Sequence, residues 1–306
     1  MKIITDKSQL DGRDLAATIG FFDGVHRGHL HLINQVKAVA AQKGLSSAVI
    51  TFREHPRKVI HTDYLPQLLT TFEERMSLLA ESGIDYCIVM DFTFELAQFT
   101  AQQFIEVILS KTFSVKALVI GYDHRFGKNR TEGFEDYVRF GKEAGMEVIH
   151  ADAFLHDKVH ISSSAARRAL QAGHIREVTM LLDRPYNIEG RVVKGHQLGR
   201  EIGFPTANLE MLDAEKILPV PGVYAVKVLW RSKEYKGMMN IGVRPTVSNA
   251  NKQTIEVHIF DFEVNVYGDV LKVFFIDKLR DERKMNGLED LITQLQMDKE
   301  EAMKRL

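Results

Sequence analysis

Short apolar runs recur along the first half of the chain, and stretches with helical spacing separate them. The runs are LAATIG (15–20), SSAVITF (46–52), DYCIVM (85–90), KALVIGY (116–122) and MEVIHA (146–151). After the first run, Leu32, Val36, Val39 and Ala40 follow the spacing of a helix with one buried face. Alternating strands and helices are typical of βα units, so the pattern predicts an α/β domain with a parallel sheet.

The second half of the chain has a period of two instead. Runs such as GVYAVKVLW (222–230), TIEVHIF (254–260) and DVLKVFFID (269–277) lie between turn residues, and a helical pattern returns only at 287–306. In TIEVHIF the apolar residues alternate with Thr254, Glu256 and His258, so we expect Glu256 on the face opposite the core. The pattern predicts an antiparallel β-barrel followed by a C-terminal helix.

A boundary is expected near LLDRPY (181–186), where a helical segment ends and proline follows. Ten of the twelve histidines precede residue 175, and five of the seven prolines lie from Pro185 onward. We therefore predict two domains, 1–182 and 183–306, which agrees with a length of 306 residues.

Composition narrows the class of protein. The chain is 45% hydrophobic and 26% charged, with a net charge of -1, so no global field favours nucleic acid or an anionic membrane as a partner. The single cysteine, Cys87, excludes disulfides within the chain. The amino terminus lacks the apolar stretch of a secretory signal, and no run is long enough to span a bilayer. We expect a cytoplasmic protein.

GFFDGVHRGH (20–29) places two imidazoles one turn apart where the first strand gives way to a helix. Ligands of open α/β sheets bind at such strand-to-helix turns, and the free N–H groups of a helix start favour phosphate. Two other interpretations exist for this spacing alone: a tight glycine turn with exposed histidines, or a zinc site, for which no further ligand cluster is present.

The same ten residues resemble the HxGH signature of the nucleotidyltransferase superfamily, in the longer form typical of bacterial FAD synthetases. Four further segments resemble that family in the same order: TFREHP (51–56), LLTTFEER (68–75), GYDHRFGKNR (121–130) and ISSSAAR (161–167). The resemblance implies a Rossmann-like nucleotidyltransferase domain that adenylylates FMN to FAD.

In such a reaction the FMN phosphate attacks the α-phosphate of ATP and releases pyrophosphate, without a protein nucleophile. The resemblance implies that His26 and His29 donate hydrogen bonds to the ATP phosphates. The complete ATP-binding set that it implies is Gly20, Phe21, Asp23, His26, His29, Asp123, Arg130, Ser163, Ser164 and Arg167. Without the resemblance, a serine-rich helix cap is the preferred interpretation of ISSSAAR.

The chain departs from the family pattern at several positions of the first half. Glu54 replaces a proline, His124 an aromatic residue, Arg75 a lysine, Ser164 a threonine and Ala166 an isoleucine. The alternative function that these departures leave open is a riboflavin kinase whose adenylyltransferase domain is diverged, weak or inactive.

GRVVKGHQLGREIGFPTANL (190–209) is the densest glycine-rich segment of the second half. Its N–H groups could surround phosphates, and Thr206 and Asn208 offer neutral oxygens to Mg²⁺. A β-hairpin flap with an ordinary turn is the alternative interpretation. No P-loop and no protein-kinase signature set is present in the sequence.

This segment closely resembles the hallmark of riboflavin kinases, and LPVPGVYAV (218–226), NIGVRPTV (240–247), TIEVHIFDF (254–262) and LRDERK (279–284) follow in that family's order. The resemblance implies that Glu256 is the general base for the riboflavin 5′-hydroxyl and that Thr206 and Asn208 hold the metal. The kinase binding set that it implies is Gly195, Gly199, Arg200, Gly203, Pro205, Thr206, Asn208, Asn240 and Arg280. Met285 stands where the family usually has phenylalanine.

Together the two resemblances imply a bifunctional enzyme that uses ATP and Mg²⁺ in both steps, with riboflavin and FMN as its other substrates and no nucleic-acid or membrane partner. Two competing classes are a flavin-responsive regulator and nucleotidyl transfer to a non-flavin acceptor. A regulator would need a DNA-reading module or a basic stripe, which the sequence lacks, and a non-flavin acceptor would leave the second half without a role.

Overall fold

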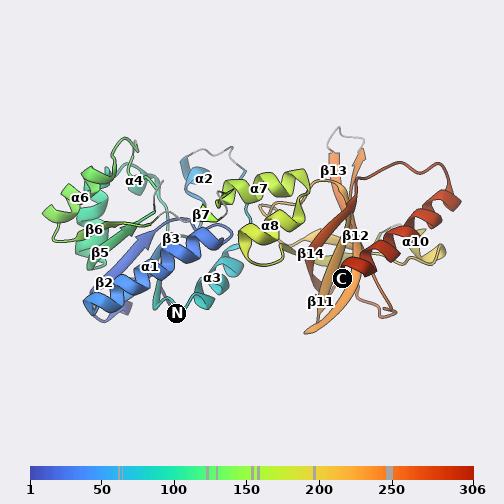
Figure 1. Cartoon of the computed structure of the whole chain (residues 1–306), viewed down its shortest axis with the longest axis horizontal. Helices are drawn as coiled ribbons and strands as arrows, with labels where there is room; N and C mark the ends of the chain where they lie inside the picture. The colour runs from blue at the N-terminus through green and yellow to red at the C-terminus, as the bar shows by residue number, and fades with distance from the viewer. Residues whose placement is uncertain are drawn as a thin grey trace. The chain divides into compact units, whose positions relative to one another are not determined.

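A computed structural model describes residues 1–306 except 61, 62, 64, 122, 123, 129, 153, 154, 157, 158, 196, 197 and 246–250, with the backbone alone at 155, 156, 159, 160, 198, 244, 245, 251 and 252. The chain divides into two units, Met1–Ser163 and Ser164–Leu306 (Figure 1). None of the helices in the described ranges is both long enough and apolar enough to cross a membrane.

The first unit contains a parallel sheet in the strand order β1-β4-β3-β2-β5-β6. Its strands are β1 (Lys2–Ile4), β2 (Leu15–Ile19), β3 (Ser46–Phe52), β4 (Tyr86–Met90), β5 (Val115–Ile120) and β6 (Glu147–His150), followed by a hairpin of β7 (Leu155–His156) and β8 (Val159–His160). Its helices are η1 (Lys7–Leu10), α1 (Arg27–Lys43), α2 (Pro56–Ile60), α3 (Phe72–Glu81), α4 (Phe94–Ala97), α5 (Ala101–Gln103), η2 (Phe104–Thr112) and α6 (Phe134–Glu143). The predicted α/β fold with a parallel sheet is confirmed.

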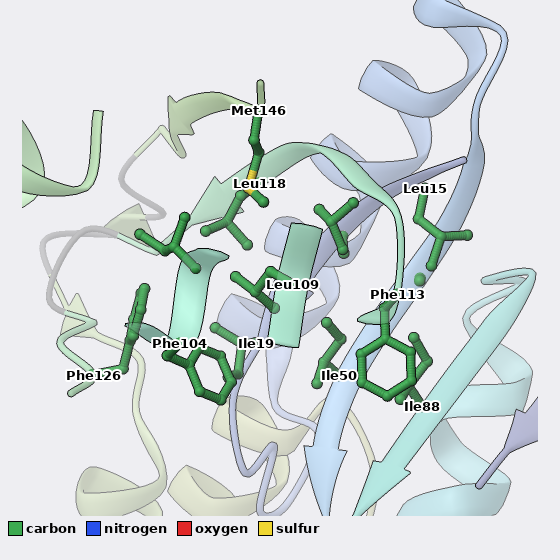
Figure 2. Close-up of a cluster of buried hydrophobic side chains, with 14 of the residues drawn as sticks. Leu15, Ile19, Ile50, Ile88, Phe104, Leu109, Phe113, Leu118, Phe126 and Met146 are labelled. Atoms are coloured by element: carbon green, nitrogen blue, oxygen red, sulfur yellow. The ribbon is translucent and has the colours of Figure 1, made fainter. Parts of the chain in front are cut away.

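Apolar side chains cover both faces of this sheet, which is why its strands read as continuous apolar runs. On one face, Ile33 and Val36 of α1 and Leu79 of α3 pack in one core cluster. On the other, Phe104 and Leu109 of η2 lie among strand residues (Figure 2). The sheet is thus the middle of three layers.

The second unit is a closed antiparallel barrel in the order β10-β13-β12-β11-β14-β9. Its strands are β9 (Asn187–Val193), β10 (Ala207–Met211), β11 (Gly222–Trp230), β12 (Lys233–Pro245), β13 (Asn251–Ile259) and β14 (Val270–Arg280). Its helices are α7 (Ser163–Ala172, which begins at the last residue of the first unit), α8 (Ile175–Leu182), α9 (Leu198–Glu201) and α10 (Leu288–Arg305). The predicted barrel and C-terminal helix are confirmed.

A smaller apolar cluster joins the outside of the barrel to α10. Ala225, Met238 and Phe260 of the barrel region pack with Phe204 and with Ala302 of α10. The opposite faces of the same strands line the barrel interior, where Tyr224 meets Phe275 edge to face at 5.3 Å between ring centroids. Strands that are buried on both sides explain the long apolar stretches of β11 and β14.

Candidate active sites

The two histidines of GFFDGVHRGH, His26 and His29, lie at the start of α1, as predicted. His26 is the N-cap residue, and its Nδ1 accepts a hydrogen bond from the backbone N–H of His29 at 3.2 Å. The two imidazole rings stack, with centroids 3.6 Å apart. Because Nδ1 of His26 is an acceptor, a neutral His26 carries its proton on Nε2, which is then a donor.

Gly28 allows the His26 ring and the carbonyl of Ile161 to lie close to the backbone at the start of α1. A Cβ at this position would lie 3.2 Å from ring atoms of His26 and 3.3 Å from the carbonyl oxygen of Ile161. Two residues after Ile161, the Ser163 hydroxyl donates to the backbone carbonyl of Asp23 at 2.8 Å. The end of the first unit therefore packs directly on the turn that precedes α1.

The Asp23 side chain is engaged by a neighbouring backbone segment. Its carboxylate, which is only 3% exposed, accepts hydrogen bonds from the N–H groups of Leu69 and Thr70 at 3.0 Å and from the Thr70 hydroxyl at 2.9 Å. The Thr70 hydroxyl oxygen in turn accepts from the N–H of Gly24 at 3.0 Å. These hydrogen bonds connect the turn before α1 to Leu69 and Thr70 and stabilise its conformation.

Gly20 and Phe21 connect this turn to the neighbouring strand β3. The N–H of Gly20 donates to the carbonyl of Ile50 at 3.0 Å, and the carbonyl of Phe21 accepts from the hydroxyl of Thr51 at 3.2 Å. The residues that follow β2 are therefore joined to β3 by one main-chain hydrogen bond and one from a side chain.

The turn lies at the point where the strand order reverses. From β2 the chain continues on one side to β3 and β4, and β5 lies on the other side, so the crevice beyond β2 and β5 is the place where open α/β sheets bind ligands. The segment that follows β5 carries Arg130, which is exposed and has a positive φ of 51°. Asp123 of the same segment lies outside the described residues. Ser164, which is exposed, and Arg167, which is half-buried, follow on α7 in the second unit.

In the second unit, three predicted site residues lie at one level of the barrel. Asn208 of β10 and Asn240 of β12 both pair in register with Glu256 of β13. Ile255 and Val257, the chain neighbours of Glu256, are 4% and 0% exposed, which confirms that Glu256 projects from the opposite face. The three polar side chains come from separate parts of the sequence and converge on one wall.

That wall belongs to a cavity of about 420 Å³ that also contains Arg280 and residues of α10. A second cavity, of about 500 Å³, is lined by Arg200, Pro205, Thr206 and the segment 262–267. Thr206 lines both cavities. The PTAN segment therefore contributes to the walls of both cavities. The lining of the first cavity includes Gly199, Phe204, Thr206, Asn208, Met238, Asn240, Glu256, His258, Arg280, Met285, Leu295 and Asp298.

The glycine-rich segment approaches the PTAN strand closely. A Cβ at Gly195 would lie 2.2 Å from Nδ2 of Asn208, so only glycine leaves the Asn208 amide its place. Gly199 and Arg200 lie on α9, and Gly203, in the turn after it, has a φ of +85°. The segment is thus folded back against β10 along the described part of its length.

His258 holds the PTAN segment from the next strand. Its Nδ1 donates to the carbonyl of Pro205 at 2.8 Å, and its ring meets Phe204 edge to face. The ring is only 7% exposed, and this burial lowers the pKa of His258 below its usual value. His258 lies on the same face of β13 as Glu256, as the strand alternation predicts, and its ring is buried because Phe204 packs against it.

Arg280 is fixed to α10 by a buried carboxylate. Its Nε and Nη2 donate to Asp298 at 2.7–3.1 Å, and the Asp298 side chain is 4% exposed. Gln294 also donates to Asp298 at 2.7 Å and accepts from Arg283. This network ties one wall of the 420 Å³ cavity to the C-terminal helix.

Across the described ranges, no group of three or more His, Cys, Asp or Glu side chains is arranged to hold a metal ion. Thr206, which borders both cavities, and Asn208, which borders the 420 Å³ cavity, instead carry neutral oxygens. Such a donor set fits Mg²⁺, which usually keeps waters and takes its remaining ligands from nucleotide phosphates.

Sequence reasoning missed three residues of these sites: Arg75, His258 and Asp298. Arg75 was noted only as a departure from lysine, yet it is 2% exposed and contacts both the turn after β2 and the end of β3. A charged residue between apolar positions of a helical pattern was the one available signal for Arg75. Nothing in the sequence pairs Asp298 with Arg280, because 18 residues separate them.

Comparison with known proteins follows the same division of the chain. The FAD synthetase family model matches residues 8–165, and the riboflavin kinase family model matches residues 182–306. Proteins named bifunctional riboflavin kinase/FMN adenylyltransferase are similar over nearly the whole chain. That of Escherichia coli K12 is 38% identical, covering 96% of this chain and 94% of its own, and that of Bacillus subtilis is 37% identical, covering 94% and 90%.

A crystal structure of a macrolide-efflux protein from Streptococcus pneumoniae superposes with a TM-score of 0.85 at 31% identity, covering 98% of this chain and 97% of its own. The fold of each unit therefore has an experimental counterpart.

Proposed function

The chain belongs to the family of bifunctional riboflavin kinase/FMN adenylyltransferases, and from this premise we propose which residues carry each activity. The second unit phosphorylates riboflavin to FMN, and the first converts FMN to FAD. We place the domain boundary between 182 and 183. The cytoplasm is the compartment we propose, because both steps consume ATP and the one cysteine fits a reducing environment.

In the first unit, the phosphate of FMN attacks the α-phosphorus of ATP. A new P–O bond forms, the bond between the α-phosphorus and its bridging oxygen breaks, and pyrophosphate leaves. Nε2 of His26 donates to the phosphate oxygens, because Nδ1 is already engaged by the helix it caps. His29 stacks on that ring and supplies a second imidazole to the same anion.

Five other predicted residues would complete the adenylyl site. Ser163 lies at the start of α7 and contacts the turn, and Ser164 and Arg167 follow it in sequence as predicted ligands of the triphosphate. Arg130 belongs to the segment after β5, and Asp123, which lies outside the described residues, stays a prediction from the sequence. Asp23 supports the turn through Leu69 and Thr70, and its direct contact with ATP stays a prediction. Because the turn before α1 and its hydrogen bonds are in place, we favour an active adenylyltransferase over an inactive one.

In the second unit, we assign riboflavin to the 420 Å³ cavity and ATP to the 500 Å³ cavity. The observation that carries this assignment is that Thr206 lines both, so the γ-phosphate and the 5′-hydroxyl can meet there. Glu256 accepts the hydroxyl proton as the oxygen attacks the γ-phosphorus, and ADP leaves. Asn240 and Arg280 support the flavin side of the wall.

When bound, Mg²⁺ would neutralise charge on the nucleotide phosphates, and Thr206 and Asn208 are the residues that would hold it. Gly195, Gly199 and Gly203 let the main chain fold over the phosphates, with Arg200 as a nearby cation. Pro205 holds its position through its contact with His258.

Two substitutions test this division of labour. Glu256→Ala should abolish FMN formation and spare the conversion of supplied FMN to FAD, whereas His29→Ala should do the reverse. FMN and FAD are separated by chromatography after incubation with ATP and Mg²⁺. Glu210→Ala, an exposed glutamate of β10 in the same barrel, is the matched control and should leave both activities unchanged. Equal loss of both activities in either folded variant would contradict the assignment.

A further inference from the structure

Arg75 of α3 is a buried cation for which the reaction steps above have no role. Its side chain lies in the first unit and is 2% exposed. Nη1 donates to the carbonyl of Phe21 at 2.9 Å, and Nη2 donates to the carbonyls of Phe52 at 2.6 Å and Arg53 at 3.1 Å. The guanidinium also lies 4.0 Å above the Phe21 ring. One side chain therefore contacts three carbonyl groups.

These carbonyls belong to two different segments of the site. Phe21 lies in the turn after β2, and Phe52 and Arg53 lie at the end of β3, where TFREHP begins. Arg75 thus bridges the carboxyl ends of two neighbouring parallel strands. Burial lowers the pKa of Arg75 to about 10, with the Asp23 carboxylate opposing the change, so the side chain remains charged at neutral pH.

The segment at the end of β3, where TFREHP begins, is well placed to contact FMN, the second substrate. ATP would occupy the crevice between β2 and β5, so the acceptor has to approach its α-phosphate from an adjacent strand end. The end of β3 is the neighbour of β2 on the other side. The His55 ring of that segment already meets the Phe21 ring edge to face, with centroids 4.7 Å apart.

We propose that Arg75 is a positioning residue for adenylyl transfer, which fixes the ATP-binding turn at a set distance from the TFREHP segment that faces FMN. This inference rests on the proposed function of the first unit. Each segment can bind its own substrate without the bridge, but attack requires both to be aligned. Loss of the bridge should therefore lower kcat more than it raises either KM.

The test compares Arg75→Met with Arg75→Lys. Methionine removes the charge and all donors, so we expect kcat for FAD formation to fall by about 100-fold, the effect of a displacement on the order of 1 Å. We expect the KM values for FMN and ATP to change less than about threefold. Lysine, the residue that the family usually has here, keeps a cation and three donors, so Arg75→Lys should retain kcat within about fivefold. Riboflavin phosphorylation by the same molecules should be unchanged.

Thr71→Ala is the matched control for a purely structural effect. Thr71 caps the same helix by accepting from the N–H of Glu74 at 3.2 Å, and its loss should lower the Tm by a few degrees without touching the bridge. We expect Thr71→Ala to keep wild-type kcat.

Three outcomes would overturn the proposal: Arg75→Met with kcat within threefold of wild type, Thr71→Ala with an equal loss of kcat, or a parallel loss of kinase activity in Arg75→Met. A wild-type protein that forms no FAD refutes the proposed function of the first unit itself. If the wild-type protein forms FAD and Arg75→Met forms it at the same rate, only the role proposed for Arg75 is refuted.

Discussion

Adding one methyl group at Gly195 tests whether the position of Asn208 matters for phosphorylation. The new Cβ would lie 2.2 Å from Nδ2, 2.5 Å from Cγ and 2.8 Å from Oδ1 of Asn208. Ordinary contact begins at 3.4 Å, so the amide has to move by about 1.2 Å. The backbone of Gly195 does not require glycine, because its φ lies outside the left-handed region.

The cost in stability and the cost in activity should differ widely. The amide is the end of a flexible side chain, so its displacement should lower the free energy of unfolding by only about 1 kcal/mol. A misplacement of about 1 Å in a positioning group can cost on the order of 100-fold in rate, which corresponds to about 2.7 kcal/mol in the barrier. Gly195→Ala should therefore be a folded protein with a severely impaired kinase.

The assay is the rate of FMN formation at saturating riboflavin, ATP and Mg²⁺, with FAD formation from supplied FMN as the internal reference. Gly287→Ala is the control in the same unit, because a Cβ there meets nothing within 4 Å and its φ is an extended 172°. In an Asn208→Ala background, the Gly195 substitution should cost little more activity, since the displaced amide is absent. Full kinase activity in Gly195→Ala, or an equal loss in both backgrounds, would refute the reasoning.

Two further predictions concern ionisable side chains. Asp298→Ala leaves the Arg280 guanidinium without its carboxylate, so urea denaturation should show that the free energy of unfolding of the second unit falls by about 3–5 kcal/mol. A loss below about 1 kcal/mol would mean that solvent screens the pair. Burial lowers the pKa of His124 from 6.5 to about 4, so the unfolded chain takes up a proton first as the pH falls. The stability that is present above pH 6.5 should be lost progressively as the pH falls toward 4. His124→Phe should remove this dependence of the free energy of unfolding on pH. Equal slopes for the two proteins, measured as urea midpoints at pH 7 and pH 5, would contradict this.

Most of the first unit could be predicted from its sequence because its strands are buried on both faces. All five residues of β2 are buried, and such a strand leaves an unbroken apolar run. β1 escaped prediction since it has three residues, two of them exposed. Likewise, the π-helical hydrogen bonding of η2 leaves no mark on the spacing of its apolar residues.

The parts of the sites that could not be predicted depend on contacts between distant segments. The partners of Arg75 lie 22 to 54 residues away, and local periodicity carries no information about them. The alternation along β13 correctly placed Glu256 and His258 on one face, but a strand pattern does not reveal that Phe204 covers His258 on that face. That Thr206 borders two cavities depends on segments distant in sequence, which local periodicity does not show.

The edge strands of the open sheet and the closure of the barrel affect how readily the protein aggregates at high concentration. The open sheet ends in β1 and β6, strands of three and four residues, and both carry exposed charged side chains, Lys2 and Glu147. Lys43 pairs with Glu147 at 2.6 Å and adds a second charge beside that border. The barrel closes on itself. Within the residues that the structure describes, neither the six-stranded sheet nor the barrel therefore offers a long, flat edge on which a neighbouring molecule could add a strand, and self-association into β-rich aggregates is disfavoured.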